Sequence, residues 1–101
     1  MKLRVEFVDA ARAIVIRVKG RIVGLFAEDL RSLVARCHVS MRIIVDLSQV
    51  SFIDSIGEDV LSWLGRLGVT FVADSAYALD TCERLRLQQL RRRSWAGRYK
   101  V

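Results

Sequence analysis

One segment of the chain carries most of the information about its architecture, and it reads Val45-Asp46-Leu47-Ser48-Gln49-Val50-Ser51-Phe52-Ile53-Asp54-Ser55-Ile56-Gly57. The short apolar run 41–45 predicts a buried strand, whereas residues 46–53 are too polar at their centre to continue it. We therefore expect a strand followed by a loop. Residues 56–67 have apolar side chains at helical spacing, and Gly68 is a stop signal. In parallel α/β folds, sites form at the edge where strands lead into helices.

The segments before this one predict two strands and a helix. Residues 3–8 begin with an apolar and polar alternation, and residues 13–18 form a branched apolar run that is typical of a central strand. The connection between them is short, which favours an antiparallel hairpin. Residues 25–37 have apolar side chains, including Phe26 and Cys37, at the spacing of one helix face, and Gly24 marks the entrance.

The segments after it predict one strand and one helix. Residues 69–72 are a short fourth strand, and Asp74 or Ser75 can cap a last helix with Leu79 and Cys82 on its apolar face, extending towards Leu90. Strands that alternate with helices imply parallel pairing and right-handed crossovers. The prediction is an α/β fold, a small single-domain sandwich in the order β-β-α-β-α-β-α. Its helices pack on a mixed, mostly parallel four-stranded sheet.

Composition narrows the class of protein. The chain has 101 residues, 52% of them hydrophobic, which is enough for one domain with its own core. Charge-free stretches reach only seven residues, and the N-terminus is charged, so we expect no membrane span, no signal peptide and a cytoplasmic location. Cys37 and Cys82 should be reduced there and act as small core residues. Their spacing with His38 does not match a zinc site, and we expect no metal and no cofactor.

The net charge of +6 is concentrated at one end. Residues 1–85 contain all 11 acidic residues and 11 of the 17 Lys and Arg, so this part is neutral. We therefore divide the chain into a domain, 1–90, and a basic tail, 91–101. The tail would suit nucleic acid or an anionic membrane surface, or it is simply a solvated end. Its basic residues are Arg91, Arg92, Arg93, Arg98 and Lys100.

Ser55 begins the motif Ser55-Ile56-Gly57-Glu58, which fits an S-x-x-E capping box at a helix N-terminus. A structural role as a cap is therefore one interpretation of this serine. Nucleophilic catalysis would need a histidine beside it, but His38 precedes the strand that Ser55 follows. The two residues are expected at opposite ends of that strand, which argues against an enzyme.

Residues 45–57 resemble the signature of STAS domains, the fold of bacterial anti-sigma-factor antagonists and of sulfate-transporter tails. The similarity extends over about residues 3–90 and includes Val18-Lys19-Gly20-Arg21-Ile22, which is similar to the glycine turn of the family. The resemblance implies a non-enzymatic module that docks an anti-sigma factor, itself a serine kinase, and is switched off by phosphorylation of the serine matched by Ser55. The implied partner-binding residues are Asp54, Ile56, Gly57 and Glu58, with Gly20, Arg21 and Gly24 as a neighbouring wall.

Three departures from the family pattern bear on that switch. Ile56 replaces a second small residue, Glu58 and Asp59 occupy positions that are usually apolar or small, and Val23 replaces a frequent aspartate. Carboxylates around Ser55 would repel a phosphate, so a module that stays unphosphorylated is an alternative. Another alternative is an accessory subunit of a membrane transporter that binds an ATPase, because STAS domains also occur in such complexes.

Overall fold

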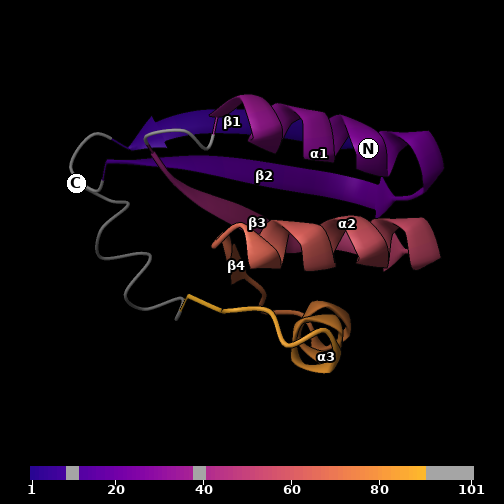
Figure 1. The fold of residues 1–101 in the computed structure, drawn as a ribbon. Coiled ribbons are helices and arrows are strands. Elements are labelled where there is room, and N and C mark those ends of the chain that lie inside the picture. The colour runs from indigo at the N-terminus through magenta and orange to yellow at the C-terminus, as the bar shows by residue number, and fades with distance from the viewer. Residues whose placement is uncertain (9–11, 38–40, 91–101) are drawn as a thin grey trace.

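The computed structural model describes residues 1–8, 12–37 and 41–90 and has an α/β architecture (Figure 1). The predicted order β-β-α-β-α-β-α is confirmed. His38 and the basic tail lie outside the described residues, so the division into 1–90 and 91–101 stays a prediction. The elements are β1 (Lys2–Val8), β2 (Ala13–Ile22), α1 (Gly24–Cys37), β3 (Arg42–Ile53), α2 (Ser55–Arg66), β4 (Thr70–Val72) and α3 (Ala76–Arg84).

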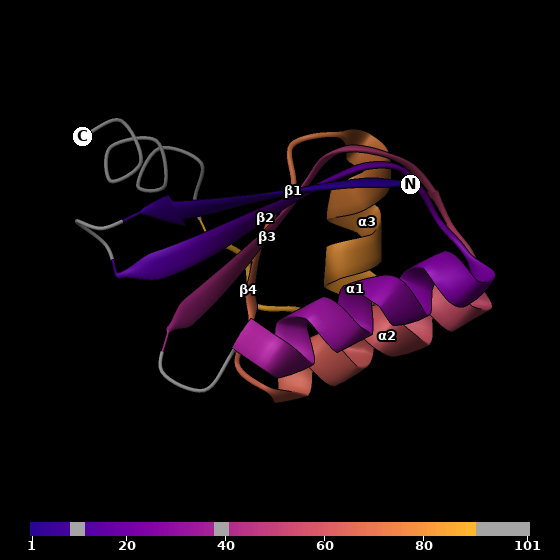
Figure 2. The ribbon, with the colours of Figure 1, turned by 90° about the horizontal axis from the view of Figure 1, so that it is seen from above.

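The four strands lie in the order β1-β2-β3-β4. As predicted, β1 pairs antiparallel with β2, whereas β2–β3 and β3–β4 are parallel. Helices α1 and α2 run side by side, and α3 lies across their direction (Figure 1, Figure 2). Because β2 and β3 are parallel neighbours, the helices that follow them begin at the same end of the sheet.

The main core lies on the face of the sheet that the helices cover. Its fully buried members come from β2, β3, β4 and all three helices, and they include Ile16, Leu30, Leu61, Phe71 and Cys82. A smaller cluster on the other face joins Ala13, Val15, Ile44 and Val72, against which Val8 and Leu90 pack. Two-sided burial explains why the apolar runs in β2 and β3 are nearly continuous.

Strand β3 is longer than predicted, because it continues through residues 46–53 instead of ending in a loop. Asp46 is buried, but its Oδ1 accepts hydrogen bonds from the amide and the hydroxyl of Ser48, at 2.9 and 2.6 Å. Two shifts in the β2–β3 register absorb the extra residues of β3. A satisfied carboxylate and local bulges therefore keep a polar segment in the sheet.

Four further predictions were wrong in detail. The predicted glycine turn belongs to β2, where Gly20 adopts a φ of +102° within the strand. Helix α3 is capped by Ser75 as predicted, but it ends at Arg84, well before Leu90. Its buried residues are Ala78, Thr81 and Cys82, whereas Leu79 is exposed. Phe26, expected on the buried face of α1, is 53% exposed.

Both cysteines are free, and Cys82 is fully buried in the main core while Cys37 packs against it. Burial, and to a lesser degree the charge of Glu83, raises the pKa of the Cys82 thiol to about 11. The thiolate is therefore scarce near neutral pH, which fits a packing role. In the described ranges, no group of His, Cys, Asp and Glu is arranged to hold a metal ion. None of the helices in the described part of the chain has the length and apolar character needed to cross a membrane.

Gly57, in the first turn of α2, allows that helix to approach β2 closely. It is buried, and a Cβ at this position would overlap the carbonyl oxygen of Ile22 and lie 2.8 Å from Cγ2 of Ile53. A backbone oxygen held in a sheet cannot move aside as a side chain can. The spacing between α2 and the ends of β2 and β3 therefore requires glycine.

We predict that Gly57→Ala destabilises the protein although alanine is the better helix former. The overlap should lower the free energy of unfolding by about 2–3 kcal/mol, against a gain of about 1 kcal/mol in helix propensity. Urea denaturation measures the difference. Gly65→Ala in the same helix is the control, since its methyl would meet only Cδ2 of Leu87, at 3.0 Å, and we expect a change below about 1 kcal/mol. Equal losses in both variants would contradict the close-approach argument.

Candidate functional site

The candidate site lies where β2 and β3 end and α1 and α2 begin. Ile22 and Ile53 are register partners at the ends of the two strands. Asp54 directly follows β3, and its amide donates a hydrogen bond to the Ile22 carbonyl at 3.2 Å. The structure thus brings the predicted residues around Gly20 and those around Ser55 to one end of the sheet.

The carboxylate of Asp54 connects both helix beginnings. Its Oδ1 accepts from the Gly57 amide at 2.7 Å and makes Asp54 the N-cap of α2. Its Oδ2 accepts from the Gly24 amide at 3.1 Å, at the first residue of α1. Gly24 has a φ of +51°, a left-handed conformation that glycine adopts without strain. One side chain therefore satisfies an unpaired amide in each of two helices.

The predicted capping box is wrong. Ser55 is the first residue of α2 and not its cap, since Asp54 occupies the cap position. Glu58 does not reach back to the helix start, because its carboxylate is bound by Arg84. Asp54 is the N-cap because it still has the extended backbone conformation that a cap requires, with φ −88° and ψ −176°.

The Ser55 side chain is exposed. No described residue forms a hydrogen bond with its hydroxyl. Because Asp54 has taken over capping, the serine is left free at a helix N-terminus, where backbone amides and the helix dipole favour an anion.

Large apolar side chains are exposed around this serine. Each lies within two residues of the Gly24–Asp54 hydrogen bond, which places them at the same end of the fold. We call this set, together with Ser55, the helix-start surface. Its apolar members and their exposed fractions are Leu25 (83%), Phe26 (53%), Ile56 (45%) and Phe52 (42%).

Sequence reasoning placed Ile56 at this site but missed Leu25, Phe26 and Phe52. Phe26 follows the apolar spacing of α1, and Phe52 lies in a segment that we expected to be a loop. They are exposed although their direct neighbours Ile53 and Ala27 are buried in the main core. No signal in a single sequence distinguishes an exposed apolar side chain in such a segment from a buried one.

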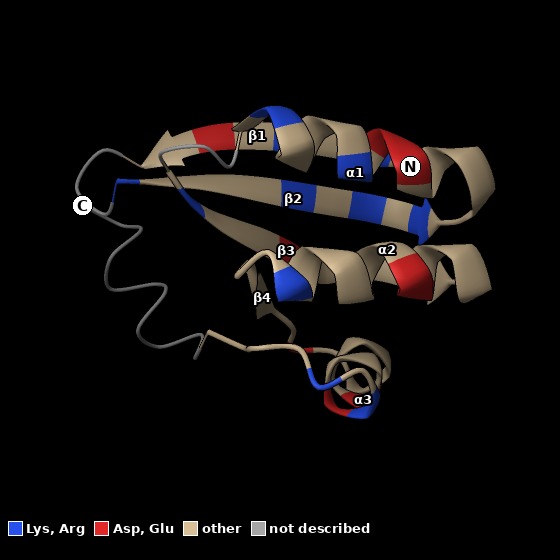
Figure 3. Ribbon diagram, viewed as in Figure 1, with Lys and Arg blue, Asp and Glu red and all other residues tan. Residues whose placement is uncertain are grey.

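Charged residues flank the surface in an ordered way. The guanidinium of Arg21 lies 5.3 Å from the centre of the Phe52 ring, a cation–π contact. Basic residues lie along β2, and the acidic residues of α1 and α2 lie in the N-terminal halves of these helices (Figure 3). Acids near helix beginnings complement the helix dipole. The apolar surface is therefore bordered by charges of both signs.

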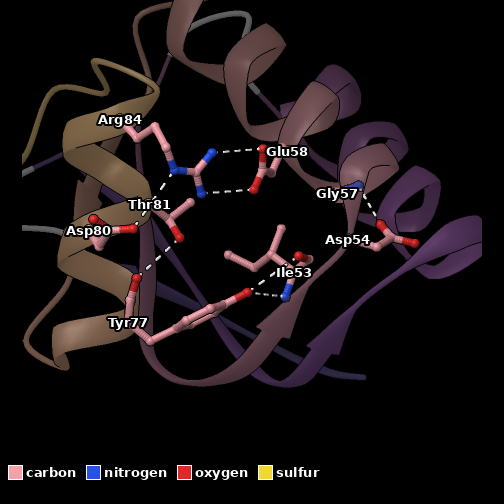
Figure 4. A network of polar contacts seen from close by, with 8 residues as sticks. All are labelled: Ile53, Asp54, Gly57, Glu58, Tyr77, Asp80, Thr81 and Arg84. Atoms are coloured by element: carbon pink, nitrogen blue, oxygen red, sulfur yellow. Dashed lines mark hydrogen bonds and ion pairs between the residues drawn. The ribbon is translucent and has the colours of Figure 1, made fainter.

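Helix α3 supports the strand end and α2 through two sets of contacts (Figure 4). The Tyr77 hydroxyl accepts from the Ile53 amide at 2.8 Å and donates to the Ile53 carbonyl at 3.3 Å. Arg84 binds both carboxylate oxygens of Glu58, at 3.0 and 2.9 Å, and lies 3.8 Å from Asp80. The bond from Arg84 lowers the pKa of Glu58. These contacts connect α3 to Ile53, which precedes Ser55, and to Glu58, which follows it.

The hydroxyl of Ser55 is accessible, and among the described residues it has no hydrogen-bond partner. The described ranges contain no histidine, and no base contacts the Ser55 hydroxyl there. A serine without a base is a weak nucleophile. Trp63 is partly buried against the main core, and the guanidinium of Arg31 lies over its ring, 4.6 Å from the ring centre.

Comparison with known proteins agrees with this geometry. The family model of the STAS domain matches residues 3–64. A structure of the anti-sigma factor antagonist SpoIIAA in its unphosphorylated form superimposes with a TM-score of 0.71 at 18% identity, covering 98% of this chain and 96% of that one. The phosphorylated form of the Bacillus cell fate determinant SpoIIAA gives 0.71 at 17% identity, covering 96% and 98%. No curated protein sequence is matched.

The fold is thus that of a small α/β module. Its parallel strands β2 and β3 are each followed by a helix, and Asp54 binds the first turn of both helices. The chain belongs to the STAS domain family. The predicted resemblance and fold class are confirmed, while the roles assigned to individual site residues remain proposals.

We predict that Asp54→Ala lowers the free energy of unfolding by about 2 kcal/mol, because two amides lose their acceptor. Asp54→Asn should lose about half of this amount, since its carbonyl oxygen can still cap Gly57 while its amide group faces the Gly24 amide. Ser55→Ala is the matched control and should stay within about 0.5 kcal/mol of the wild type. Urea denaturation provides all three values. A loss in Ser55→Ala as large as in Asp54→Ala would restore Ser55 as the cap.

We predict a pH-dependent contribution from the Glu58–Arg84 pair. The folded-state pKa of Glu58 is lowered, so its stabilisation is present above the unfolded pKa, near the ordinary 4.5, and is lost as the pH falls through the lowered value. Arg84→Met should therefore lower the melting temperature slightly at pH 7 and not at a pH where Glu58 is protonated. Arg66→Met, at an exposed arginine in the last turn of α2, should show no such pH dependence. If the difference in melting temperature between Arg84→Met and the wild type were the same at every pH, the Glu58–Arg84 pair would not be the source of the pH dependence.

Proposed function

We propose that this protein is a non-enzymatic, cytoplasmic interaction module that docks an anti-sigma factor or a related serine kinase through the helix-start surface. The observation that supports this most directly is an exposed, unbonded Ser55 among exposed apolar side chains at the strand end of a STAS fold. The solved structures with the same fold are of an anti-sigma factor antagonist.

A protein partner fits this surface better than a small molecule does. Leu25, Phe26 and Ile56 project from two helix beginnings and are largely exposed. Contiguous exposed apolar groups with charged neighbours are typical of protein-binding sites. The Asp54 cap and the α3 contacts keep the backbone beneath these side chains rigid, which reduces the entropy lost on binding.

Phosphorylation of Ser55 would act as an off-switch at this surface. A phosphate adds about −1.5 to −2 charges at pH 7. Asp54 occupies the amide of Gly57 with its side chain and that of Glu58 with its carbonyl, so the amides of Ser55 and Ile56 remain available to an anion in the described structure. The fold would accept the phosphate, whereas an apolar partner surface would not.

The carboxylates that the sequence places around Ser55 oppose a phosphate less than their number suggests. Asp54 accepts two backbone hydrogen bonds, and Glu58 is paired with Arg84. Asp59 is exposed and has no partner among the described residues. The repulsion expected from three carboxylates is therefore partly compensated by neighbouring donors.

We predict that Ile56→Asp and Phe26→Asp each weaken binding to the cognate kinase by about tenfold or more, because apolar anchors dominate such interfaces. Purified candidate kinases encoded beside this protein are titrated calorimetrically. Leu79→Asp, at an exposed apolar residue of α3, is the control and should bind like the wild type. Ser55→Ala should retain binding and Ser55→Asp should weaken it, and mass spectrometry should place phosphate on Ser55.

Equal binding by all these variants would reject the helix-start surface as the docking site. Phosphate found only at other residues would reject the switch while leaving docking intact. Binding to a transporter ATPase in place of every kinase would favour the accessory-subunit alternative.

A further inference from the structure

Strand β1 is an open edge of the sheet. It pairs with β2 on one side, and in the described part of the chain no strand pairs with its other side. The opposite edge is protected: β4 has three residues, and residues 88–90 bond to it through the Phe71 amide and carbonyl, at 2.9 and 2.8 Å. An open edge strand of seven residues is a template for pairing with another strand.

The two faces of β1 differ in chemistry. Leu3, Val5 and Phe7 lie on the face that the helices cover, because their partners across β2 include the core residues Val18 and Ile16. Leu3 packs on the core, but Val5 is 49% exposed and Phe7 61% exposed. The other face carries Lys2, Arg4 and Glu6.

The charge pattern of β1 is complementary to itself in one register. We propose that this edge pairs with the same edge of a second copy of the chain, antiparallel and centred on Val5. In this register Arg4 of each copy lies opposite Glu6 of the other, Val5 faces Val5, and Leu3 faces Phe7. Opposite charges and apolar pairs directly across an antiparallel ladder are stabilising, which supports the match.

Other registers are unfavourable. A shift of one residue would set the apolar face against the charged face. Centring the pair on Arg4 would place Lys2 opposite Glu6 but would also juxtapose two guanidinium groups, and centring it on Glu6 would juxtapose two carboxylates, because each residue at the centre faces itself. A parallel in-register pair would also place like charges together. The register centred on Val5 avoids all four conflicts, and the two-fold symmetry makes the Arg4–Glu6 and Leu3–Phe7 contacts occur twice.

The existing ion pairs of Glu6 are compatible with this arrangement. Nη1 of Arg17 lies 2.6 Å from Oε1 of Glu6, and Nε of Arg4 lies 3.7 Å from the same atom. The Arg4 side chain is 77% exposed at the edge, so it is free to reach across to the second copy. The two-fold axis is perpendicular to the joined sheet. Both α1 helices therefore lie on the same face of that sheet, on either side of the Val5 and Phe7 side chains of the two copies. A single strand pair is a small interface, and a dimer of micromolar or weaker affinity is expected.

The test uses charge reversal in the full chain, followed by sedimentation velocity over a range of concentrations. The wild type should show a reversible monomer–dimer equilibrium. Arg4→Glu and Glu6→Arg should each reduce the association constant by about tenfold, since each creates two like-charge pairs. A mixture of the two variants should form a heterodimer with the affinity of the wild type, because opposite charges face each other again. The double variant, carrying both reversals, should also dimerise.

Arg42→Glu is the matched control, an exposed arginine in β3 that lies away from the edge, and it should dimerise like the wild type. Since Glu6→Arg also removes a partner of Arg17, melting curves verify that each variant is folded. A wild type that remains monomeric at the highest soluble concentration would overturn the proposal. Single reversals that dimerise normally, or a mixture that fails to recover, would also overturn it. Kinase binding through the helix-start surface can be measured whether or not the protein dimerises, because that surface lies at the ends of β2 and β3 and not along the β1 edge.

Discussion

The hydrogen bonds of Asp54 are the constraint on which the candidate site of this domain depends. Its carboxylate accepts from the first residue of α1 and from the first turn of α2, and its amide donates to the last residue of β2. Helix amides at an N-terminus have no partner within the helix, so two neighbouring helices would otherwise need two caps. A shared cap fixes their beginnings relative to each other and to the sheet.

This arrangement makes the next residue available for function. A serine that caps a helix spends its hydroxyl on the backbone, whereas Ser55 sits one position later and remains exposed. The close approach at Gly57 brings α2 onto the ends of both strands, so that exposed apolar side chains of two helices lie at the same end of the fold as the serine. Packing that stabilises the fold and exposure that permits recognition therefore arise from adjacent residues.

Helix α3 extends this support from the opposite side. Tyr77 holds the last residue of β3 through its backbone, and Arg84 holds Glu58 one turn into α2. The hydroxyl of Tyr77 thus binds the end of β3 and the guanidinium of Arg84 binds α2. Ser55 lies between these two points of contact in the sequence. Under the proposed function, a phosphate on Ser55 would therefore change the surface of the domain without rearranging the elements beneath it.

The amino-acid sequence by itself determined the element order, the parallel pairing of the last three strands, the burial of Cys82 and the position of Ser55 at a helix beginning, because hydrophobic periodicity and turn residues are local signals. The tertiary structure alone decided which residue caps α2, that the polar segment 46–53 remains in the sheet, that Arg84 binds Glu58 and that Phe26 is exposed. Three of these outcomes involve a partner distant in the chain: the bulged ladder of β2 for β3, Arg84 of α3 for Glu58, and the Gly24 amide, which Asp54 binds in addition to the nearby Gly57 amide. Local patterns cannot specify such partners, since hydrogen bonds and burial are settled only when the elements pack together.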